Sequence, residues 1–244
     1  MTRVRFIFRL FGLIALVLAI VPVHVISKLF GPSPWPPRFL GAAARIAGFR
    51  VTVRGNPLRR DVFYIANHMS WIDILVLGGA TGCAFISKDA VAHAPIVSWL
   101  ARQNNTIFIA RERRGEVGAQ VETVRAAMAS HQPVTLFPEG TTGNGRELLP
   151  FKPALFAVLL PPPRAMHIQP VMLDYGTFGP LIAWRDGESG LANAIRILGS
   201  PGAKTLTLHF LDAFDPGTHP DRKTLAQETY ARIAAARDAL ASAA

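Results

Sequence analysis

The chain begins with an extended apolar segment. After three arginines in the first nine residues, an apolar run extends from Leu10 to Ile26, and only Pro22 and His24 interrupt it. A helix needs roughly 20 apolar residues to span a bilayer, so this run is borderline, and Pro22 would kink it. The pattern predicts a membrane anchor. It either spans the bilayer, with the arginines keeping the N-terminus cytoplasmic, or lies in the interface.

Short apolar runs follow at regular spacing along the rest of the chain. A Pro-rich break at residues 31–37 leads into a short helix predicted for residues 38–49. Beyond it, runs rich in Val, Ile, Phe and Thr are bounded by Gly, Pro, Asn or Asp, which is typical of strands. The predicted strands are residues 50–55, 62–67, 83–87, 106–110, 133–137, 167–173 and 205–211.

Helical stretches separate these strands. In residues 115–131, Val117, Val121, Val124 and Met128 recur at intervals of three and four, as in an amphipathic helix packed on a sheet. Strands that alternate with helices predict an α/β fold, here a single domain with a mostly parallel central sheet flanked by helices. The other predicted helices are residues 70–79, 94–103, 150–161, 190–199 and 219–244.

The same pattern divides the chain into two parts. Residues 1–44 are predicted to form the N-terminal membrane anchor and a short linking helix. Residues 45–244 are predicted to form the α/β domain, which closes with an Ala-rich C-terminal helix. Neither an internal repeat nor a low-complexity linker interrupts this second part, so we expect one folded unit.

Composition narrows the range of partners. The chain carries 26 Lys and Arg against 16 Asp and Glu, a formal net charge of +10, which favours an anionic partner. The sequence has no zinc-finger spacing, no RNP-like strand and no basic heptad helix, so nucleic acid is excluded and an anionic membrane surface is preferred. The lone Cys83 excludes an internal disulfide and is predicted to be a small core residue.

Residues 65–75, IANHMSWIDIL, place two titratable side chains in an otherwise apolar run. Ser70 is a good N-cap for a helix beginning at Trp71, and Asp73 would then complete a capping box. That explanation leaves out His68, which ends a predicted strand, where open α/β sheets bind ligands. At such a corner Asp73 would accept a hydrogen bond from one imidazole nitrogen and leave the other basic.

Two further strand ends carry polar residues. FPEGTTGNG places Glu139 and a glycine-rich loop after one strand, and Lys152 follows the loop. Glycines let backbone N–H groups converge on anionic oxygens, but the Gly-Lys-Ser/Thr of a P-loop is missing. Arg111 ends another strand. The alternative for the glycine-rich stretch is an ordinary crossover loop, and the alternative for the stretch around Arg111 is a solvated basic loop.

The remaining histidines lack the spacing of metal ligands, so no metal site is predicted.

Together and in this order, these stretches resemble the glycerolipid acyltransferases of the lysophosphatidic acid acyltransferase type. The family block N-H-x-S-x-x-D matches residues 67–73, F-I-x-R matches residues 108–111, and F-P-E-G-T matches residues 137–141. A fourth block, a hydrophobic strand around a proline, is similar to residues 168–171. The resemblance covers about residues 45–175. Four ordered blocks are far more specific than any one of them.

The resemblance implies a role for each block within a catalytic domain at residues 45–244. His68 would be the general base, and Asp73 would orient it. The base would remove the proton from a hydroxyl of a lysolipid, and the acyl donor would be acyl-CoA or acyl-ACP (acyl carrier protein). Neither a metal nor an organic cofactor is implied. The residues that would hold the acceptor headgroup are Arg111, Glu139, Gly140, Thr141, Thr142 and Lys152.

Thr142 departs from the family pattern, because phosphate-binding members continue F-P-E-G-T with arginine. A threonine can donate one hydrogen bond but supplies no charge. Arg146, Lys152 or Lys88 would have to compensate, or the acceptor is not a phosphomonoester.

The activity that dominates the family predicts 1-acyl-sn-glycerol-3-phosphate as the acceptor and phosphatidic acid as the product. Lyso-ornithine lipid is the alternative acceptor, because FPEGTT followed by LPFK looks closer to that branch of the family. An alternative of another class is a non-catalytic, lipid-binding membrane scaffold. In either case the protein would be associated with a membrane, at the cytoplasmic face of the inner membrane if it is bacterial.

Overall fold

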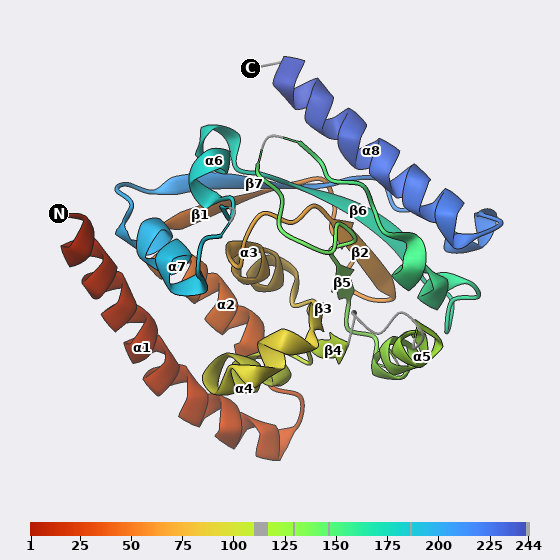
Figure 1. Cartoon of the computed structure of the whole chain (residues 1–244). Coiled ribbons are helices and arrows are strands. Elements are labelled where there is room, and N and C mark those ends of the chain that lie inside the picture. The colour runs from red at the N-terminus through yellow and green to blue at the C-terminus, as the bar shows by residue number, and fades with distance from the viewer. Residues whose placement is uncertain (110–116, 129, 146, 186, 243–244) are drawn as a thin grey trace.

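A seven-stranded sheet forms the centre of the molecule (Figure 1). The structure, a computed structural model, describes residues 1–109, 117–128, 130–145, 147–185 and 187–242. Each predicted strand segment forms a strand. The bounds are β1 Phe49–Arg54, β2 Val62–Ala66, β3 Ala84–Lys88, β4 Ile107–Ile109, β5 Val134–Leu136, β6 His167–Asp174 and β7 Lys204–Phe210.

The strands lie in the order β1-β7-β6-β2-β5-β3-β4. All neighbouring pairs are parallel except β6 and β7, which are antiparallel. The prediction of an α/β fold with a mostly parallel sheet is therefore confirmed. In a parallel sheet the carboxyl ends of neighbouring strands meet at one edge, and this edge brings the loops after β2, β5 and β6 together.

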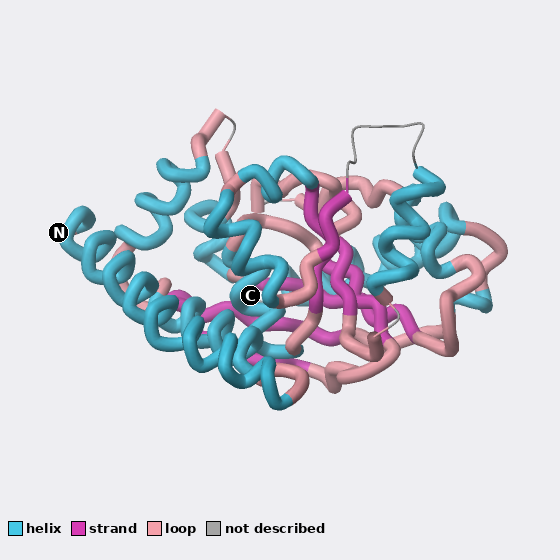
Figure 2. The backbone as a smooth tube through the Cα atoms, turned by 90° about the horizontal axis from the view of Figure 1, so that it is seen from below, coloured by secondary structure: helices cyan, strands magenta, loops and turns pink. Residues whose placement is uncertain are grey.

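Helices cover both faces of this sheet, as Figure 2 shows. They are α1 Thr2–Ser27, α2 Trp35–Ile46, α3 Ile72–Thr81, α4 Pro95–Gln103, α5 Val117–Ala127, α6 Gly179–Ile182, α7 Gly190–Gly199 and α8 Arg222–Ser242. The helix predicted for residues 150–161 is instead a short 3-10 helix, Pro153–Leu159. Pro153 is tolerated at its first position, but the prolines at residues 161–163 donate no backbone hydrogen bond and prevent the helix from extending further.

The side chains of β2 alternate between two hydrophobic core clusters, one on each face of the sheet. Val62, Tyr64 and Ala66 pack into a core cluster with residues of α2, α3 and α7. Phe63 and Ile65 pack into a second cluster with α5, the 3-10 helix and α8 on the opposite face. All five side chains are buried, which explains why this strand is uniformly apolar rather than alternating with polar residues. The strand thereby fixes the position of the loop that follows it.

Helix α1 lies along the body of the protein and continues through Pro22 (Figure 1). Near its start, Arg9 Nη1 donates to the carbonyl oxygens of Leu198 and Ser200, at 3.0 and 2.9 Å. Near its end, His24 Nε2 lies 3.1 Å from Oε1 of Gln103 in α4. The predicted domain boundary after residue 44 stays a prediction, and α2 extends beyond it to Ile46.

Two glycines let α2 and α3 pack closely. A Cβ atom on Gly79 would lie 2.6 Å from the Cα atom and 2.6 Å from the N atom of Gly41, which is closer than real Cβ contacts come. Both of these atoms belong to the backbone. Because backbone atoms cannot turn aside as a flexible side chain can, a methyl group here would push the two helices apart. Helix α3 begins at the predicted active-site corner, so its packing also determines the position of that corner.

We predict that Gly79→Ala lowers the free energy of unfolding by about 1–3 kcal/mol, the usual range for overpacking a tight interior. Gly118→Ala, on α5, is the matched control, because a Cβ atom there would meet no atom of the described residues within 4 Å. Alanine is favoured over glycine inside a helix by up to about 1 kcal/mol, so the control should be neutral or stabilising. Guanidinium unfolding followed by circular dichroism measures both, and equal stabilities would contradict this packing account.

Candidate active site

The corner between β2 and α3 brings His68 and Asp73 together. Nδ1 of His68 lies 2.8 Å from Oδ2 of Asp73. The imidazole follows the carboxyl end of β2, and the carboxylate belongs to the first turn of α3. Because an ionised carboxylate can only accept, Nδ1 must be the protonated nitrogen. In the neutral imidazole Nε2 is then the basic nitrogen.

Asp73 also forms part of the helix start. Its Oδ2 accepts from the backbone N–H groups of Met69 and Ser70, at 2.6 and 2.9 Å. Ser70 Oγ accepts from Ile72 N at 3.1 Å, and α3 begins at Ile72, one residue later than predicted. The predicted N-cap is therefore wrong, because Trp71 and not Ser70 is the N-cap and no side chain caps it. The carboxylate of Asp73 nevertheless accepts two backbone N–H groups just before the helix and pairs with His68 at the same time.

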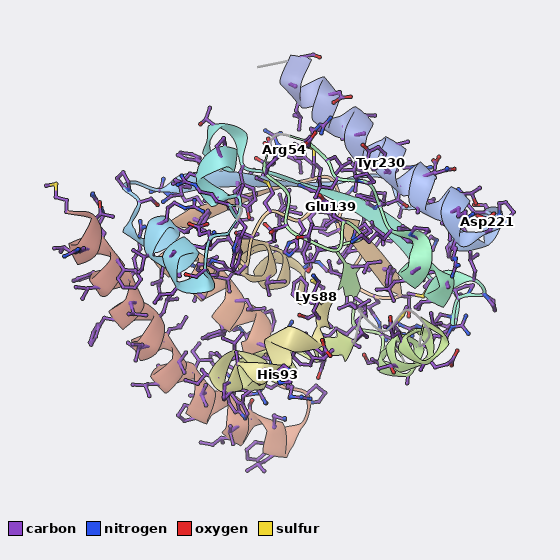
Figure 3. The ribbon with its side chains drawn as sticks, viewed as in Figure 1. Arg54, Lys88, His93, Glu139, Asp221 and Tyr230 are labelled. Atoms are coloured by element: carbon purple, nitrogen blue, oxygen red, sulfur yellow. The ribbon has the colours of Figure 1, made fainter. Side chains whose placement is uncertain are left out.

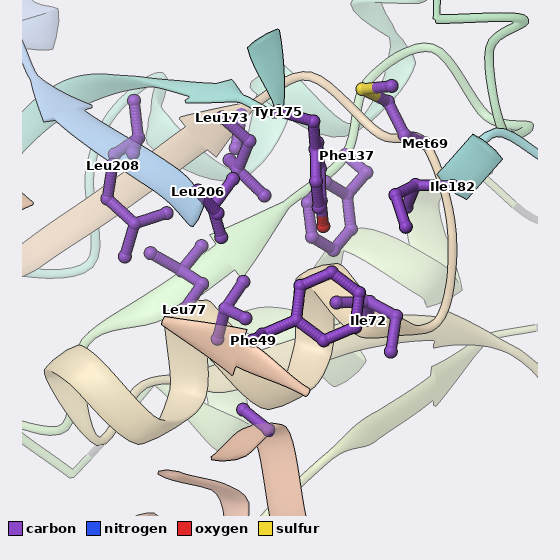
Figure 4. Packing of buried hydrophobic residues seen from close by; sticks show 14 of the residues in the cluster. Phe49, Met69, Ile72, Leu77, Phe137, Leu173, Tyr175, Ile182, Leu206 and Leu208 are labelled. Atoms are coloured by element: carbon purple, nitrogen blue, oxygen red, sulfur yellow. The ribbon is translucent and has the colours of Figure 1, made fainter. Parts of the chain in front are cut away.

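Tyr175 provides a further donor that the sequence analysis did not find. Its hydroxyl, just after β6, donates to Oδ1 of Asp73, and both side chains are buried. Burial and the neighbouring carboxylate raise the pKa of Tyr175 well above its usual value, so the hydroxyl stays protonated and donates. The one available signal was its place directly after the strand that contains the fourth family block. Figure 4 shows its ring beside Phe137 in the core cluster.

Phe137 holds the plane of the imidazole. The rings of His68 and Phe137 are stacked, with centroids 4.2 Å apart and an angle of 16° between their planes. Phe137 is itself buried and stacks on Phe85. The side chain of His68 is 21% exposed, whereas that of Asp73 is not exposed at all. One ring face thus rests on the core, and part of the imidazole remains open to a substrate.

Glu139 fixes the backbone of His68 from the other side. Its Oε1 accepts from His68 N at 2.7 Å, and its Oε2 accepts from Leu149 N at 3.1 Å. Burial raises the pKa of Glu139 to about 7, against the opposing effect of the two hydrogen bonds. Gly143 N also donates to His68 O, at 2.7 Å. The predicted contact between Glu139 and the substrate stays a prediction, and these contacts add a structural role.

The loop after β5 brings Gly140 and Lys152 together. Gly140 has a positive φ of 75°, and a Cβ atom there would lie 2.7 Å from Nζ of Lys152. The positive φ favours glycine at this position, whereas the flexible end of Lys152 could move aside for a larger residue. Thr141 is exposed and Thr142 is half-buried on the same loop. The predicted headgroup ligand Arg111, and Arg146, lie outside the described residues.

A pocket of about 110 Å³ opens between this loop, the end of β6 and α8. His68 and Glu139 are among the residues that line it. Figure 3 shows Glu139 near the centre of the molecule, between α3 and α8. Asn67, which follows β2, links two segments of the pocket lining, because its side chain donates to Leu173 O of β6 at 3.1 Å and accepts from Leu173 N at 2.8 Å. In the part of the chain that is described, no three His, Cys, Asp or Glu side chains gather to hold a metal ion.

Known proteins share both the sequence and this fold. The sequence pattern of the Acyltransferase family matches residues 50–174. A lyso-ornithine lipid O-acyltransferase of Rhizobium meliloti (strain 1021) is 34% identical, with 91% of this chain and 82% of that protein aligned. A protein of the same description from Rhodobacter capsulatus is 32% identical over 91% of this chain and 86% of its own. A 1-acyl-sn-glycerol-3-phosphate acyltransferase of Neisseria gonorrhoeae is 35% identical, over 39% of this chain and 37% of its own.

A solved structure extends this similarity to the whole fold. It is the crystal structure of the 1-acyl-sn-glycerophosphate (LPA) acyltransferase PlsC from Thermotoga maritima, which superimposes with a TM-score of 0.67 and covers 98% of both chains. The two sequences are 19% identical, so this comparison shows the fold alone. The family match over half of the chain, and the relatives that align with nearly all of it, show that this protein belongs to the acyltransferase family.

Proposed function

We propose that the protein is an O-acyltransferase that moves a fatty acyl group from a thioester donor to the hydroxyl of a lysolipid. The observation that carries the proposal is the pairing of His68 with the buried Asp73, which leaves Nε2 unprotonated in the neutral ring. The family and the lysolipid relatives support an acceptor of this class. A non-catalytic scaffold would have no need of such a pair, so that alternative is disfavoured.

In this mechanism Nε2 of His68 removes the proton of the acceptor hydroxyl while the oxygen attacks the thioester carbon. The tetrahedral intermediate then expels the thiolate of CoA or acyl carrier protein, which takes the proton back from the imidazolium. Asp73 stabilises the imidazolium and keeps the ring in its orientation. General base catalysis contributes roughly 10²–10⁴-fold, and positioning of the two substrates supplies the remainder. No step requires a metal or an organic cofactor.

Lyso-ornithine lipid is our preferred acceptor, and 1-acyl-sn-glycerol-3-phosphate is the second candidate. Relatives named for the first activity align with 91% of this chain, against 39% for the relative named for the second. Thr142 supports the same choice, because it supplies no charge where phosphate binding favours arginine. We propose that Arg111, Gly140, Thr141 and Lys152 contact the acceptor next to the part of its headgroup that enters the pocket beside His68.

We further propose that α1 lies in the membrane interface rather than across the bilayer. The helix is long and apolar enough to span, but Arg9 near one end and His24 near the other both contact the globular body. Exposed apolar side chains lie on α1, α4 and α7, which share one side of the molecule in Figure 1. They include Phe8, Phe11, Ile14 and Leu18 of α1, Ile96, Val97 and Trp99 of α4, and Leu191 and Ile195 of α7.

The net charge of +10 would add attraction to anionic headgroups at this surface. A monotopic position keeps the pocket within reach of a lysolipid that remains in the bilayer. If the protein is bacterial, we assign it to the cytoplasmic face of the inner membrane, where a CoA or acyl carrier protein thioester is available.

Transfer assays test the proposed function. Purified protein is given a labelled acyl thioester with lyso-ornithine lipid or with lysophosphatidic acid, and the esterified lipid is measured. We expect an esterified product from lyso-ornithine lipid. If lysophosphatidic acid also gives a product, its kcat/KM should be lower than that of lyso-ornithine lipid. In His68→Ala, removal of the base should lower kcat by roughly 10²–10⁴-fold.

His167→Ala is the matched control, because His167 is exposed at the start of β6, away from the carboxyl edge of the sheet. It should keep the wild-type rate. Undiminished transfer by folded His68→Ala would exclude His68 as the base. A higher kcat/KM for lysophosphatidic acid would reverse our choice of acceptor.

Tyr175 should act as a positioning residue. Tyr175→Phe removes the hydroxyl that donates to Asp73 and should lower kcat roughly 10- to 100-fold, because that hydrogen bond is made to a buried charge. KM for the acceptor should change much less than kcat, because the variant keeps the ring that lines the pocket and loses only a hydroxyl that donates to Asp73. Tyr64→Phe is the control, because its hydroxyl donates to Leu58 O, and it should keep the wild-type kcat. Equal kcat values for the two variants would contradict this role.

A further inference from the structure

The pocket beside His68 carries an unusual balance of charge for an acceptor site in a basic protein. Among the described residues that line it, three are acidic, Glu139, Glu147 and Asp174, and only Arg237 is a permanent cation. The whole chain has the opposite excess, with a net charge of +10. A local reversal of sign in a cleft favours a ligand that carries positive charge.

Asp174 is the carboxylate best placed to meet such a ligand. It ends β6, one residue before Tyr175, and its side chain is 32% exposed. Its Oδ1 accepts from Gly176 N at 2.8 Å, which fixes the side chain. Its Oδ2 lies 3.9 Å from Nε2 of His209, beyond hydrogen-bond length. One oxygen is thus held in position while the other keeps its capacity to accept.

His209 does not neutralise this carboxylate at neutral pH. Burial lowers the pKa of His209 and nearby Arg54 acts in the same direction, against the opposing effect of Asp174. The imidazole is therefore mostly neutral at pH 7, and the negative charge of Asp174 is left for a ligand. Glu139 contributes less, because both of its oxygens already accept backbone hydrogen bonds and burial raises its pKa to about 7.

The rim of the pocket carries charges of both signs. Glu147, on the loop after β5, is exposed, and its Oε1 accepts from the side chain of Asn144 at 3.1 Å. Arg237, on α8, lines the same pocket and has a side chain that is 38% exposed. Its Nη2 lies 3.1 Å from Asp238, an exposed pair that contributes little and can be exchanged for a ligand.

We propose that this pocket binds the zwitterionic headgroup of the acceptor, with Asp174 and Glu147 binding its ammonium group and Arg237 its carboxylate. The inference rests on the proposed function and names the substrate class of that site. An ornithine headgroup joined to its fatty chain through one amino group keeps one ammonium and one carboxylate, which matches the charges present. Because His68 lines the same pocket, a headgroup held there leaves the acceptor hydroxyl close to the base.

The same charges disfavour a phosphomonoester. Among the described lining residues, a dianionic phosphate would meet Asp174 and Glu147 with Arg237 alone to offset them, and like charges in a cleft repel strongly. The pocket therefore reinforces the effect of Thr142, but through different residues. The acidic side chains would thus favour lyso-ornithine lipid over lysophosphatidic acid in two ways, by attracting the ammonium group and by repelling the phosphate.

A cycle of two protein variants and two substrates tests the inference. Wild type and Asp174→Asn are each assayed with lyso-ornithine lipid and with the same lipid acetylated on its free amine. Asparagine keeps the acceptor for Gly176 N, so the fold should be retained. We expect Asp174→Asn to raise KM about 10- to 100-fold for the free amine, because a hydrogen bond between charged groups is lost. KM for the acetylated lipid, which carries no ammonium, should stay within about twofold.

Glu122→Gln, which removes an exposed carboxylate of α5 far from the pocket, should leave both KM values at the wild-type level. Circular dichroism of each variant confirms that it is folded. An equal change in KM for the two lipids in Asp174→Asn, or no change for either, would overturn this inference and leave the proposed function standing. If wild type transferred no acyl group to any lysolipid, the proposed function and this inference would both fall.

Discussion

The buried carboxylate of Asp73 is the group on which the active-site corner depends. A charge removed from water is stable only when hydrogen-bond donors replace its hydration, and here four donors do so. Two are backbone N–H groups at the start of α3, one is the imidazole of His68 and one is the hydroxyl of Tyr175. Because these donors come from the ends of β2, α3 and β6, one ionised side chain joins three elements. The conformation that satisfies the charge is also the one that orients the imidazole.

The surroundings remove the remaining freedom of His68. Its backbone N–H is held by Glu139 and its carbonyl by Gly143, both from the loop after β5, while Phe137 of the same segment supports the ring. An imidazole that is fixed at the backbone, at one ring nitrogen and at one ring face needs little reorganisation to act as the base that we propose. The parallel sheet makes this possible, since it brings the ends of β2, β5 and β6 to one edge, and the pocket opens at that edge.

Sequence reasoning predicted the strands well, because short β-branched runs between turn residues are strong local signals. It also anticipated the approach of His68 and Asp73, which are five residues apart at one corner. It did not find Tyr175, which lies 102 residues from Asp73, because no local pattern shows which strand end will face which helix. For the same reason it assigned Glu139 to the substrate without seeing its two backbone donors. The antiparallel placement of β7 on β6 was likewise not anticipated, since hydrophobic periodicity carries no strand direction.

The protonation state of His68 tests the central claim most directly. Protein labelled with ¹⁵N in histidine, compared with His68→Ala to assign the signal, reports which ring nitrogen carries the proton in the neutral imidazole. If Asp73 holds Nδ1 as described, the spectrum will show a protonated Nδ1 and an unprotonated Nε2. A neutral ring protonated at Nε2 would place the proton on the nitrogen that must act as the base, and would contradict the account.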